Sequence, residues 1–303
     1  MNNQMPAISL AAIPGRRVRT LDLVPSIERA GFTGIYGPSL ADNLSLCAAL
    51  AFKSSQIRFG TSITPIYTRQ VQDFAQMASF IHEVSGCRFD FGIGVSHQPS
   101  MSRLGIKQGK PLSDMRKFVS ELKEVPRAGE LPPLIIATLR KKMIQLSEEI
   151  ADGMVFANGA RSHMSDSLAV LSENTRTNES FFIGNMIPTC INDDVDAAME
   201  VNRRTLTSYA YLPNYRNYWK EAGYEEEMNA IEECLSHGRR EDVPRYLTDR
   251  WLADTTLFGT QSQVREGIEA WFDAGIKTPI IVPSAVSGGQ FQAIEDLLNL
   301  YRN

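Results

Sequence analysis

Short apolar runs alternate with amphipathic stretches along the chain, and this rhythm constrains the fold more than any other feature. The runs that we predict as strands are Pro6–Pro14, Gly34–Leu40, Arg58–Pro65, Phe89–Ser96, Pro133–Leu139, Gly153–Asn158, Phe181–Ile191 and Thr278–Pro283. Buried parallel strands are continuous apolar runs, and alternating strands and helices imply a parallel sheet covered by helices. Eight such units within 303 residues predict an α/β fold of the (β/α)₈ TIM-barrel class. An open, doubly wound sheet is the alternative.

Helical periodicity follows each strand. The helices that we predict with definite bounds are Thr20–Ala30, Asp42–Lys53, Gln70–Val84, Ser113–Val125, Arg140–Ala151, Ser162–Leu171 and Gln290–Tyr301. Asp42 or Asn43 is the expected N-cap of the second of these helices, because short polar side chains accept hydrogen bonds from the first free amides.

A long stretch between Ile191 and Thr278 interrupts the rhythm. Its pattern is mostly helical, so we predict a helical insertion over about residues 192–257, between strands 7 and 8 of a single domain spanning residues 1–303. Long insertions in compact domains are usually lids or binding loops. The candidate substrate-binding residues in this aromatic-rich insertion are Tyr211, Tyr215 and Trp219. The alternative is that these aromatic side chains only pack the extra helices together.

The composition and the net charge limit which classes of partner the protein can bind. The formal net charge is -4, which argues against a nucleic-acid partner, because such proteins carry a clustered basic face. No apolar stretch approaches the ~20 residues that span a bilayer, and no basic region precedes the first apolar run, as a secretion signal would require. The 4 cysteines are widely spaced, so we expect reduced thiols. We therefore expect a soluble, cytoplasmic protein that acts on a small molecule, with no nucleic-acid or membrane partner.

Two glycines end the fourth predicted strand, at the face where (β/α)₈ barrels carry their active sites. Gly92 and Gly94 suggest a GxGxxG dinucleotide motif, but His97 stands where the third glycine belongs. Glycine on a strand also allows the close approach of a backbone or a planar ligand. This second interpretation fits the sequence better.

Three cations open the fifth predicted helix, namely Arg140, Lys141 and Lys142. Positive charge at a helix N-terminus opposes the helix dipole. These side chains therefore either point into solvent or accompany a bound anion such as a phosphate. Arg161 repeats the pattern at the sixth helix.

His97 is the one histidine at the carboxyl end of a predicted strand and is our candidate catalytic residue, as a general acid or a ligand contact. The alternative is a histidine that is hydrogen bonded within a loop. The sequence has no HxxxH or HExxH spacing, so we expect no metal site. It also has no GxSxG motif. This shortage of acid–base and nucleophilic groups favours a bound cofactor that performs the difficult chemical step.

Segments at the strand ends resemble the luciferase-like monooxygenase superfamily, in order along most of the chain. The segments that carry the resemblance are Arg58–Arg69, Ser85–His97, Pro132–Leu139, Glu149–Gly153, Phe258–Val264 and Ala274–Ile276. The fourth-strand sequence GVSH, Gly94–His97, is more similar to the branch that uses coenzyme F420 than to the branch that uses FMN.

The resemblance implies a barrel with an insertion, a homodimer and a bound deazaflavin. It implies a non-proline cis peptide between Ser62 and Ile63, at a bulge that supports the middle ring of the cofactor. The other cofactor contacts that it implies are Thr64, Ser96, Ala137, Thr138, Leu139, Arg140, Asn158 and Gly159. Contacts to the phosphate and tail of the cofactor map onto Ala137–Arg140, and also onto Asn158 and Gly159.

The sequence departs from the family pattern at two places that matter for proton transfer. Several relatives carry an acidic residue and a histidine after the second strand, where this chain has Gly37–Asp42. Others carry a glutamate after the fourth strand, where this chain has His97 and Gln98. No complete acid–base pair is carried over, and His97 as its substitute is a hypothesis.

These features together predict an F420-dependent oxidoreductase that transfers a hydride between the deazaflavin and a small organic substrate. One alternative is an FMN-dependent monooxygenase of the same fold. Another is a protein that binds a deazaflavin or flavin without turnover. A third is a non-redox lyase or isomerase that uses the Arg140 region to bind a substrate phosphate.

Overall fold

The chain folds into parallel strands that alternate with helices. A computed structural model describes residues 4–39 and 42–301; Leu40, the predicted end of the second strand, and Ala41 lie outside the described residues. The chain divides into two compact units. The first unit is Met1–Phe156 with Val170–Gly184, and the second is Ala157–Ala169 with Asn185–Asn303. The prediction of a single domain over residues 1–303 stays a prediction.

The first unit contains six strands in chain order and one short additional strand. The strands are β1 (Ala7–Ser9), β2 (Gly34–Gly37), β3 (Arg58–Thr61), β4 (Thr64–Pro65), β5 (Phe89–Gly94), β6 (Leu134–Ala137) and β7 (Gly153–Ala157). They pair in parallel in the order β1-β2-β3-β5-β6-β7, and β4 also pairs with β5. The order follows the chain without the reversal that defines a doubly wound sheet, so that alternative is wrong.

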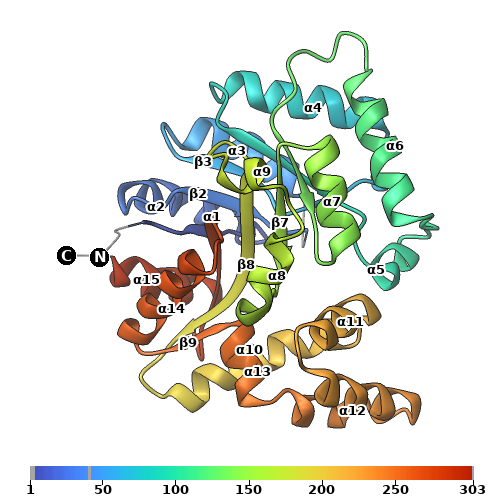
Figure 1. The fold of residues 1–303 in the computed structure, drawn as a ribbon. Coiled ribbons are helices and arrows are strands. Elements are labelled where there is room, and N and C mark those ends of the chain that lie inside the picture. Colours follow the sequence, from blue (N-terminus) through green and yellow to red (C-terminus); the bar gives the residue numbers. More distant parts are fainter. Residues whose placement is uncertain (1–3, 40–41, 302–303) are drawn as a thin grey trace. The chain divides into compact units, whose positions relative to one another are not determined.

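Helices cover the strands of the first unit. They are α1 (Arg17–Asp22), α2 (Val24–Arg29), α3 (Asn43–Lys53), α4 (Val71–Val84), α5 (Gln98–Arg103), α6 (Pro111–Lys123), α7 (Lys141–Ile150) and α9 (Glu173–Thr177). Successive large helices pack on one another, α3 on α4, α4 on α6 and α6 on α7 (Figure 1). Phe74 of α4 packs on Phe91 of β5 and on Phe118 of α6, so aromatic side chains fill the layer that joins strands to helices.

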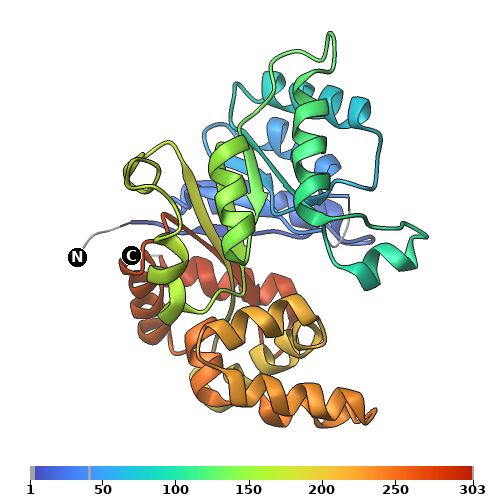
Figure 2. The ribbon, with the colours of Figure 1, turned by 45° about the vertical axis from the view of Figure 1, so that its right-hand side comes forward.

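The second unit contains the remaining strands and the predicted insertion. Its elements are η1 (Arg161–His163), α8 (Met164–Leu168), most of β8 (Phe182–Ile191), α10 (Val195–Ala210), α11 (Pro213–Glu221), α12 (Glu225–Ser236), η2 (Arg240–Tyr246), α13 (Asp249–Thr255), β9 (Leu257–Gly259), α14 (Gln261–Asp273), β10 (Thr278–Ser284) and α15 (Gly289–Leu300). β8 pairs with both β9 and β10. The helices coloured yellow to orange in Figure 2 occupy the region predicted as the insertion, and α11 packs beside α12 there.

The fold class is the predicted (β/α)₈ barrel. Its strand positions are β1, β2, β3 together with β4, β5, β6, β7, β8 and β10, and β9 is an additional strand. Two expectations about local structure are corrected. The predicted helix Thr20–Ala30 is two helices, α1 and α2, and Pro25 in the first turn of α2 has no N–H with which to continue the hydrogen bonds of α1. The predicted strand Pro6–Pro14 shortens to Ala7–Ser9.

The strand register brings the predicted site residues of the first unit together. Thr64 lies opposite Ile93, and Pro65 lies opposite Gly94. Ile93 in turn lies opposite Ile136, the residue before Ala137. Because the carboxyl ends of parallel strands meet at one end of a barrel, the ends of β4, β5 and β6 form a continuous surface.

Candidate functional site

A non-proline cis peptide joins Ser62 to Ile63 between β3 and β4, at the bond that the resemblance implied. Three side chains around it are buried, with Thr61 at 1%, Ser62 at 7% and Thr64 at 4% exposure. The Thr61 hydroxyl donates to the Gly92 carbonyl at 2.6 Å and so links β3 to β5. The turn between β3 and β4 is therefore held by the neighbouring strand.

Asn43, at the start of α3, connects three segments at this turn. Its Nδ2 donates to the carbonyls of Gly37 and Ile63, both at 3.2 Å. Its Oδ1 accepts from the Thr64 hydroxyl at 2.9 Å. Asp42 is the N-cap of α3, with its side chain accepting from the Ser45 amide. Asn43 is thus a site residue that the sequence pattern placed only as an alternative cap.

The two glycines of β5 leave room for close neighbours. A Cβ on Gly92 would lie 1.8 Å from the Thr61 carbonyl oxygen. A Cβ on Gly94 would lie 2.7 Å from the Ile63 Cδ1 and 3.0 Å from the Ala137 Cβ. The absence of a side chain on Gly94 therefore lets the half-buried, apolar side chains of Ile63 and Ala137 pack closely over this strand end.

The end of β6 carries an unpaired buried hydroxyl. The backbone amide of Thr138 donates to the Val155 carbonyl at 2.9 Å. Its Oγ1 is buried and has no hydrogen-bond partner within residues 4–39 and 42–301. α7 starts three residues later with Arg140 as an uncapped N-cap, no acidic residue in its first turn, and Lys141 and Lys142 exposed. Free amides, cations and an unpaired hydroxyl together favour an anion here.

The end of β5 leads into a loop that is held by hydrogen bonds from side chains. Ser96 adopts a left-handed conformation with φ 59°, and Gln108 donates to the Val95 carbonyl. Asp114 of α6 accepts from the Tyr67 hydroxyl at 2.6 Å and from the Gly109 amide at 3.0 Å. Burial and the neighbouring Asp114 raise the pKa of Tyr67.

His97 follows this strand end as the N-cap of α5. Burial lowers the pKa of its imidazole, since the charged form loses hydration. The ring is therefore neutral at pH 7 and has one N–H to donate. The catalytic role of His97 stays a prediction.

The segment that follows β7 belongs to the second unit and is held by hydrogen bonds from the rest of that unit. Asn158 has a left-handed backbone with φ 56°; its carbonyl accepts from the Trp219 indole at 3.1 Å. The Gly159 amide donates to the Asn185 Oδ1 at 3.3 Å, and the Ala160 amide donates to the hydroxyl of Tyr218 at 3.0 Å.

The aromatic residues predicted to bind substrate occupy different environments. Trp219 is fully buried and contacts Trp251 with ring centroids 4.6 Å apart. Tyr215 is also buried and packs on Trp219 at 5.3 Å. Tyr211 donates to the Arg240 carbonyl at 3.4 Å, and the Arg240 guanidinium covers its ring. Trp219 therefore donates its hydrogen bond to the Asn158 carbonyl from within the core of the second unit. The three predicted contacts with the substrate stay predictions.

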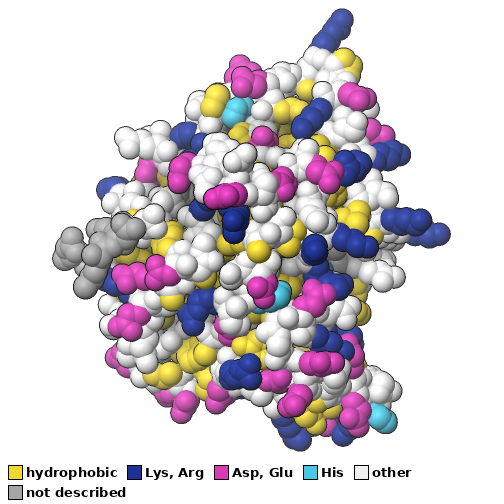
Figure 3. Space-filling model, viewed as in Figure 1, with side chains coloured by type: hydrophobic (Ala, Val, Ile, Leu, Met, Phe, Trp, Pro, Cys, Tyr) yellow, Lys and Arg dark blue, Asp and Glu magenta, His cyan; other side chains and the backbone are white. Residues whose placement is uncertain are grey.

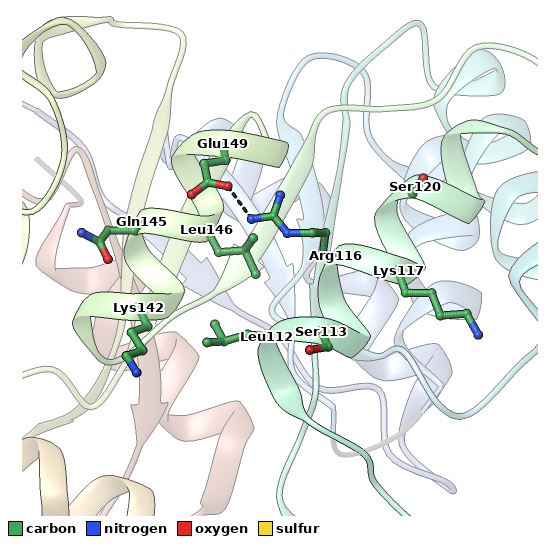
Figure 4. A pocket seen from close by; sticks show the side chains of 9 residues that line it. All are labelled: Leu112, Ser113, Arg116, Lys117, Ser120, Lys142, Gln145, Leu146 and Glu149. Atoms are coloured by element: carbon green, nitrogen blue, oxygen red, sulfur yellow. Dashed lines mark hydrogen bonds and ion pairs between the residues drawn. The ribbon is translucent and has the colours of Figure 1, made fainter.

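The helical surface of the first unit has a groove of 520 Å³ between α6 and α7 (Figure 4). Leu112 and Leu146 form its floor, and the ion pair of Arg116 with Glu149 crosses one end. Lysine and arginine side chains gather over α5, α6 and α7 in the surface view (Figure 3). The groove lies between helices and not at the strand ends that carry the predicted cofactor contacts.

Among residues 4–39 and 42–301, no group of three or more His, Cys, Asp or Glu side chains is arranged to hold a metal ion. No helix in that same part of the chain combines the length and the apolar character that a membrane crossing requires.

Comparisons with known proteins agree with the strand-end features. The model of the luciferase-like monooxygenase family matches residues 9–278. A 5,10-methylenetetrahydromethanopterin reductase of Archaeoglobus fulgidus is 25% identical over 284 residues, covering 83% of this chain and 84% of the relative.

Solved structures share the fold at low sequence identity. The coenzyme F420-dependent tetrahydromethanopterin reductase of Methanopyrus kandleri superposes with a TM-score of 0.77 at 15% identity, over 97% of this chain and 98% of the other. An F420-dependent secondary alcohol dehydrogenase in complex with an F420–acetone adduct gives a TM-score of 0.70 at 14% identity, over 99% and 100%. The barrel fold is thereby confirmed by comparison as well as by topology.

Proposed function

Because the chain belongs to the luciferase-like monooxygenase family, we propose that it is a coenzyme F420-dependent oxidoreductase that acts on a small organic substrate. The proposal rests on the apolar strand-end surface that the half-buried side chains of Ile63 and Ala137 form over Gly94, beside the cis peptide of Ser62 and Ile63. Two solved structures of the same fold whose enzymes are F420-dependent support the choice of cofactor.

The residues of the first unit fit a deazaflavin. Ile63, Gly94 and Ala137 supply an apolar surface for a planar ring. The unpaired Thr138 hydroxyl and the N-terminus of α7 supply donors for a phosphate. A bound deazaflavin accepts or donates a hydride, so the protein need only bind, orient and handle protons.

His97 is the proposed proton-handling residue. Its imidazole is neutral at pH 7 because burial lowers its pKa, and a neutral imidazole can donate through one ring nitrogen and accept through the other. Replacement of His97 by Ala should lower kcat while the affinity for the cofactor stays the same. Unchanged turnover in this variant would mean that His97 takes no part in catalysis.

Titration of the purified protein with F420 and FMN in parallel tests the cofactor assignment. Tight binding of F420 alone supports the proposal. Tight binding of FMN alone moves the function to an FMN-dependent monooxygenase, which the same surface beside Gly94 would also accept. Binding of neither leaves the barrel in place and removes the redox assignment.

Two further expectations belong to the same proposal. We propose a homodimer, which sedimentation equilibrium would test, and a cytoplasmic location, which fractionation of the source cells would test. A small-molecule substrate follows from the proposed chemistry, and a screen of alcohols and reduced pterins with F420 would identify its class.

A further inference from the structure

The loop of residues 95–110 joins β5 to α6 and carries two of the predicted site residues. Ser96 and His97 stand at its start, directly before the short helix α5. Ser96 has a left-handed backbone with φ 59°, a conformation that residues with a side chain keep only where their surroundings enforce it. Loops of this length are otherwise among the most mobile parts of a domain. The placement of both side chains therefore depends on what holds the loop.

Some hydrogen bonds give the loop its internal shape. The Met101 amide donates to the His97 carbonyl at 3.1 Å, and the Ile106 amide donates to the Met101 carbonyl at 3.0 Å. Gln108 donates through its side chain to the Val95 carbonyl and so joins the two ends of the loop. All of these bonds connect residues of the loop with one another. They shape the loop, but they do not fix it to the strands of the barrel.

Asp114, in the first turn of α6, holds the far end of the loop. Its Oδ2 accepts from the Gly109 amide at 3.0 Å and from the Tyr67 hydroxyl at 2.6 Å. A Cβ on Gly109 would lie 2.6 Å from the same oxygen, so the carboxylate can approach this closely only because residue 109 is a glycine. Burial and the neighbouring Asp114 raise the pKa of Tyr67. Its hydroxyl therefore keeps its proton and donates at neutral pH.

Tyr67 lies on the segment that also holds the near end of the loop. It follows β4, whose last residue, Pro65, lies opposite Gly94, the last residue of β5. The intervening Ile66 is buried, and its amide donates to the Gly94 carbonyl at 3.0 Å. The bond from Tyr67 to Asp114 spans 47 residues of sequence. The segment after β4 thus fastens the loop at both of its ends.

We propose that Tyr67 and Asp114 are positioning residues, which fix the loop of residues 95–110 on the strand ends. By holding the loop, they place Ser96 and His97 beside the cofactor. The inference rests on the proposed function, because the loop has this role only if the strand ends bind a deazaflavin or flavin. Groups that take part in binding or proton transfer have to be held in place by the residues around them. Two side chains that anchor the loop from outside it meet that requirement.

Cleavage by trypsin measures how often the loop opens. Arg103 and Lys107 are exposed and lie within the loop. We expect trypsin to cleave native Tyr67→Phe and Asp114→Leu after these residues about tenfold faster than the unaltered protein, because cleavage follows the population of the open form and each variant loses an anchoring hydrogen bond. The midpoint of urea unfolding should change little, because the anchor serves the loop and not the barrel.

The imidazole signals of the 4 histidines report on His97 without a substrate. NMR identifies the His97 signal by its absence from His97→Gln. In Tyr67→Phe we expect the pKa of His97 to rise towards 6.5, the value of an exposed ring, because an open loop no longer buries it. Addition of the cofactor that binds, F420 or FMN, should shift the His97 signal in the unaltered protein and shift it less in Tyr67→Phe. The signals of the other three histidines should be the same in both proteins.

Conservative and neighbouring variants separate the anchor from a general loss of structure. Asp114→Asn keeps an oxygen that can accept both bonds, and should restore slow cleavage and the His97 signal. Thr68→Val removes the neighbouring hydroxyl, which donates to the Pro65 carbonyl at 2.9 Å, and should leave both readouts unchanged. The double variant Tyr67→Phe, Asp114→Leu should open the loop no more than Asp114→Leu alone, because the first change removes a bond that the second has already broken.

The possible results separate this inference from the proposed function. Unchanged cleavage and an unchanged His97 signal in folded Tyr67→Phe and Asp114→Leu would overturn the inference. Faster cleavage that is matched by an equal loss of global stability would also overturn it, because the loop would then open only with the whole barrel. A cofactor that binds without moving the His97 signal would overturn the inference and leave the proposed function standing. An unaltered protein that binds neither F420 nor FMN would overturn the proposed function, and the placement of His97 beside a cofactor with it.

Discussion

Asn43 joins two other segments around the proposed ring surface to the start of α3. Its side chain bonds to Gly37 at the end of β2 and to the consecutive residues Ile63 and Thr64 at the β3–β4 turn. The residue is 5% exposed, so water does not replace these bonds when the side chain is removed. The geometry of the β3–β4 turn therefore depends on a side chain from a helix that follows a different strand.

Asn43→Ala should destabilise the protein and weaken cofactor binding together. Loss of the side chain leaves two buried carbonyls and one hydroxyl without partners, which costs about 2–4 kcal/mol in the free energy of unfolding. Urea unfolding and F420 titration would measure both effects. Asp42→Ala is the matched control, because it removes the exposed cap of the same helix, worth ~1 kcal/mol, and an exposed ion pair with Arg69. Equal cofactor affinity in the Asn43 and Asp42 variants would contradict the role given to Asn43.

His97 should make the free energy of unfolding depend on pH. Burial lowers its pKa in the folded protein below the value of 6.5 that it has when exposed. Below about pH 6.5 the unfolded chain then binds more protons than the folded one, so stability falls as the pH falls towards the folded pKa. Above that window this histidine contributes no pH dependence. His97→Gln should flatten the slope in urea unfolding between about pH 5 and pH 7; an unchanged slope would mean that the ring titrates alike in both states.

At the scale of the element, β5 shows how two glycines of one strand serve different purposes. A Cβ on Gly92 would collide with a backbone oxygen of β3, which cannot move without breaking the strand pairing. A Cβ on Gly94 would meet only side-chain atoms, those of Ile63 and Ala137, which can shift without loss of the strand pairing. The first glycine is required by the barrel and the second by the surface that we assign to the cofactor.

Replacement of each glycine by Ala should therefore give different phenotypes. Gly92→Ala should cost more than about 3 kcal/mol of stability and give little folded protein. Gly94→Ala should fold with a cost of about 1 kcal/mol and bind F420 at least about tenfold more weakly, equivalent to ~1.4 kcal/mol. Gly267→Ala in α14, where the new Cβ would likewise meet a mobile side chain, is the control. Calorimetry would measure the stability of each variant, and cofactor titration its affinity for F420. Full affinity in Gly94→Ala would mean that the ring of the cofactor does not bind beside Gly94.

At the scale of the whole molecule, the barrel was predictable because its strands are buried on both faces. A strand such as Phe89–Gly94, buried along its whole length, is apolar apart from Asp90, which is paired with Tyr36 and Arg58, and such runs stand out in a sequence. The break between α1 and α2 is also encoded locally, by Pro25. It was missed because the apolar periodicity continues across it.

The candidate site was predictable only where it lies on strand ends. Ser62, Gly94 and Thr138 stand next to strands that the apolar pattern marks, so their neighbourhood followed from the fold. The roles of Asn43 and Asp114 could not be predicted in this way, because their hydrogen-bond partners are 21 and 47 residues away in the sequence. A single sequence carries no local signal for such contacts, and the same holds for the Trp219 bond to the Asn158 carbonyl.

The chain passes from the first compact unit to the second within β8, because Phe182–Gly184 belong to the first unit and the rest of the strand to the second. Loss of structure in either unit would therefore remove part of a strand that the other unit uses. We expect the chain to unfold in one cooperative transition, as the prediction of a single domain requires.

The tryptophans make this expectation measurable. All 3 tryptophans of the chain, Trp219, Trp251 and Trp271, lie in the second unit and are fully buried, so their fluorescence reports on that unit alone. Far-UV circular dichroism reports on the helices of both units. Coincident urea transitions by the two probes, with equal midpoints and slopes, are the expected result. A fluorescence transition that precedes or follows the dichroism transition would instead mean that the units unfold separately, and that the single-domain prediction is wrong.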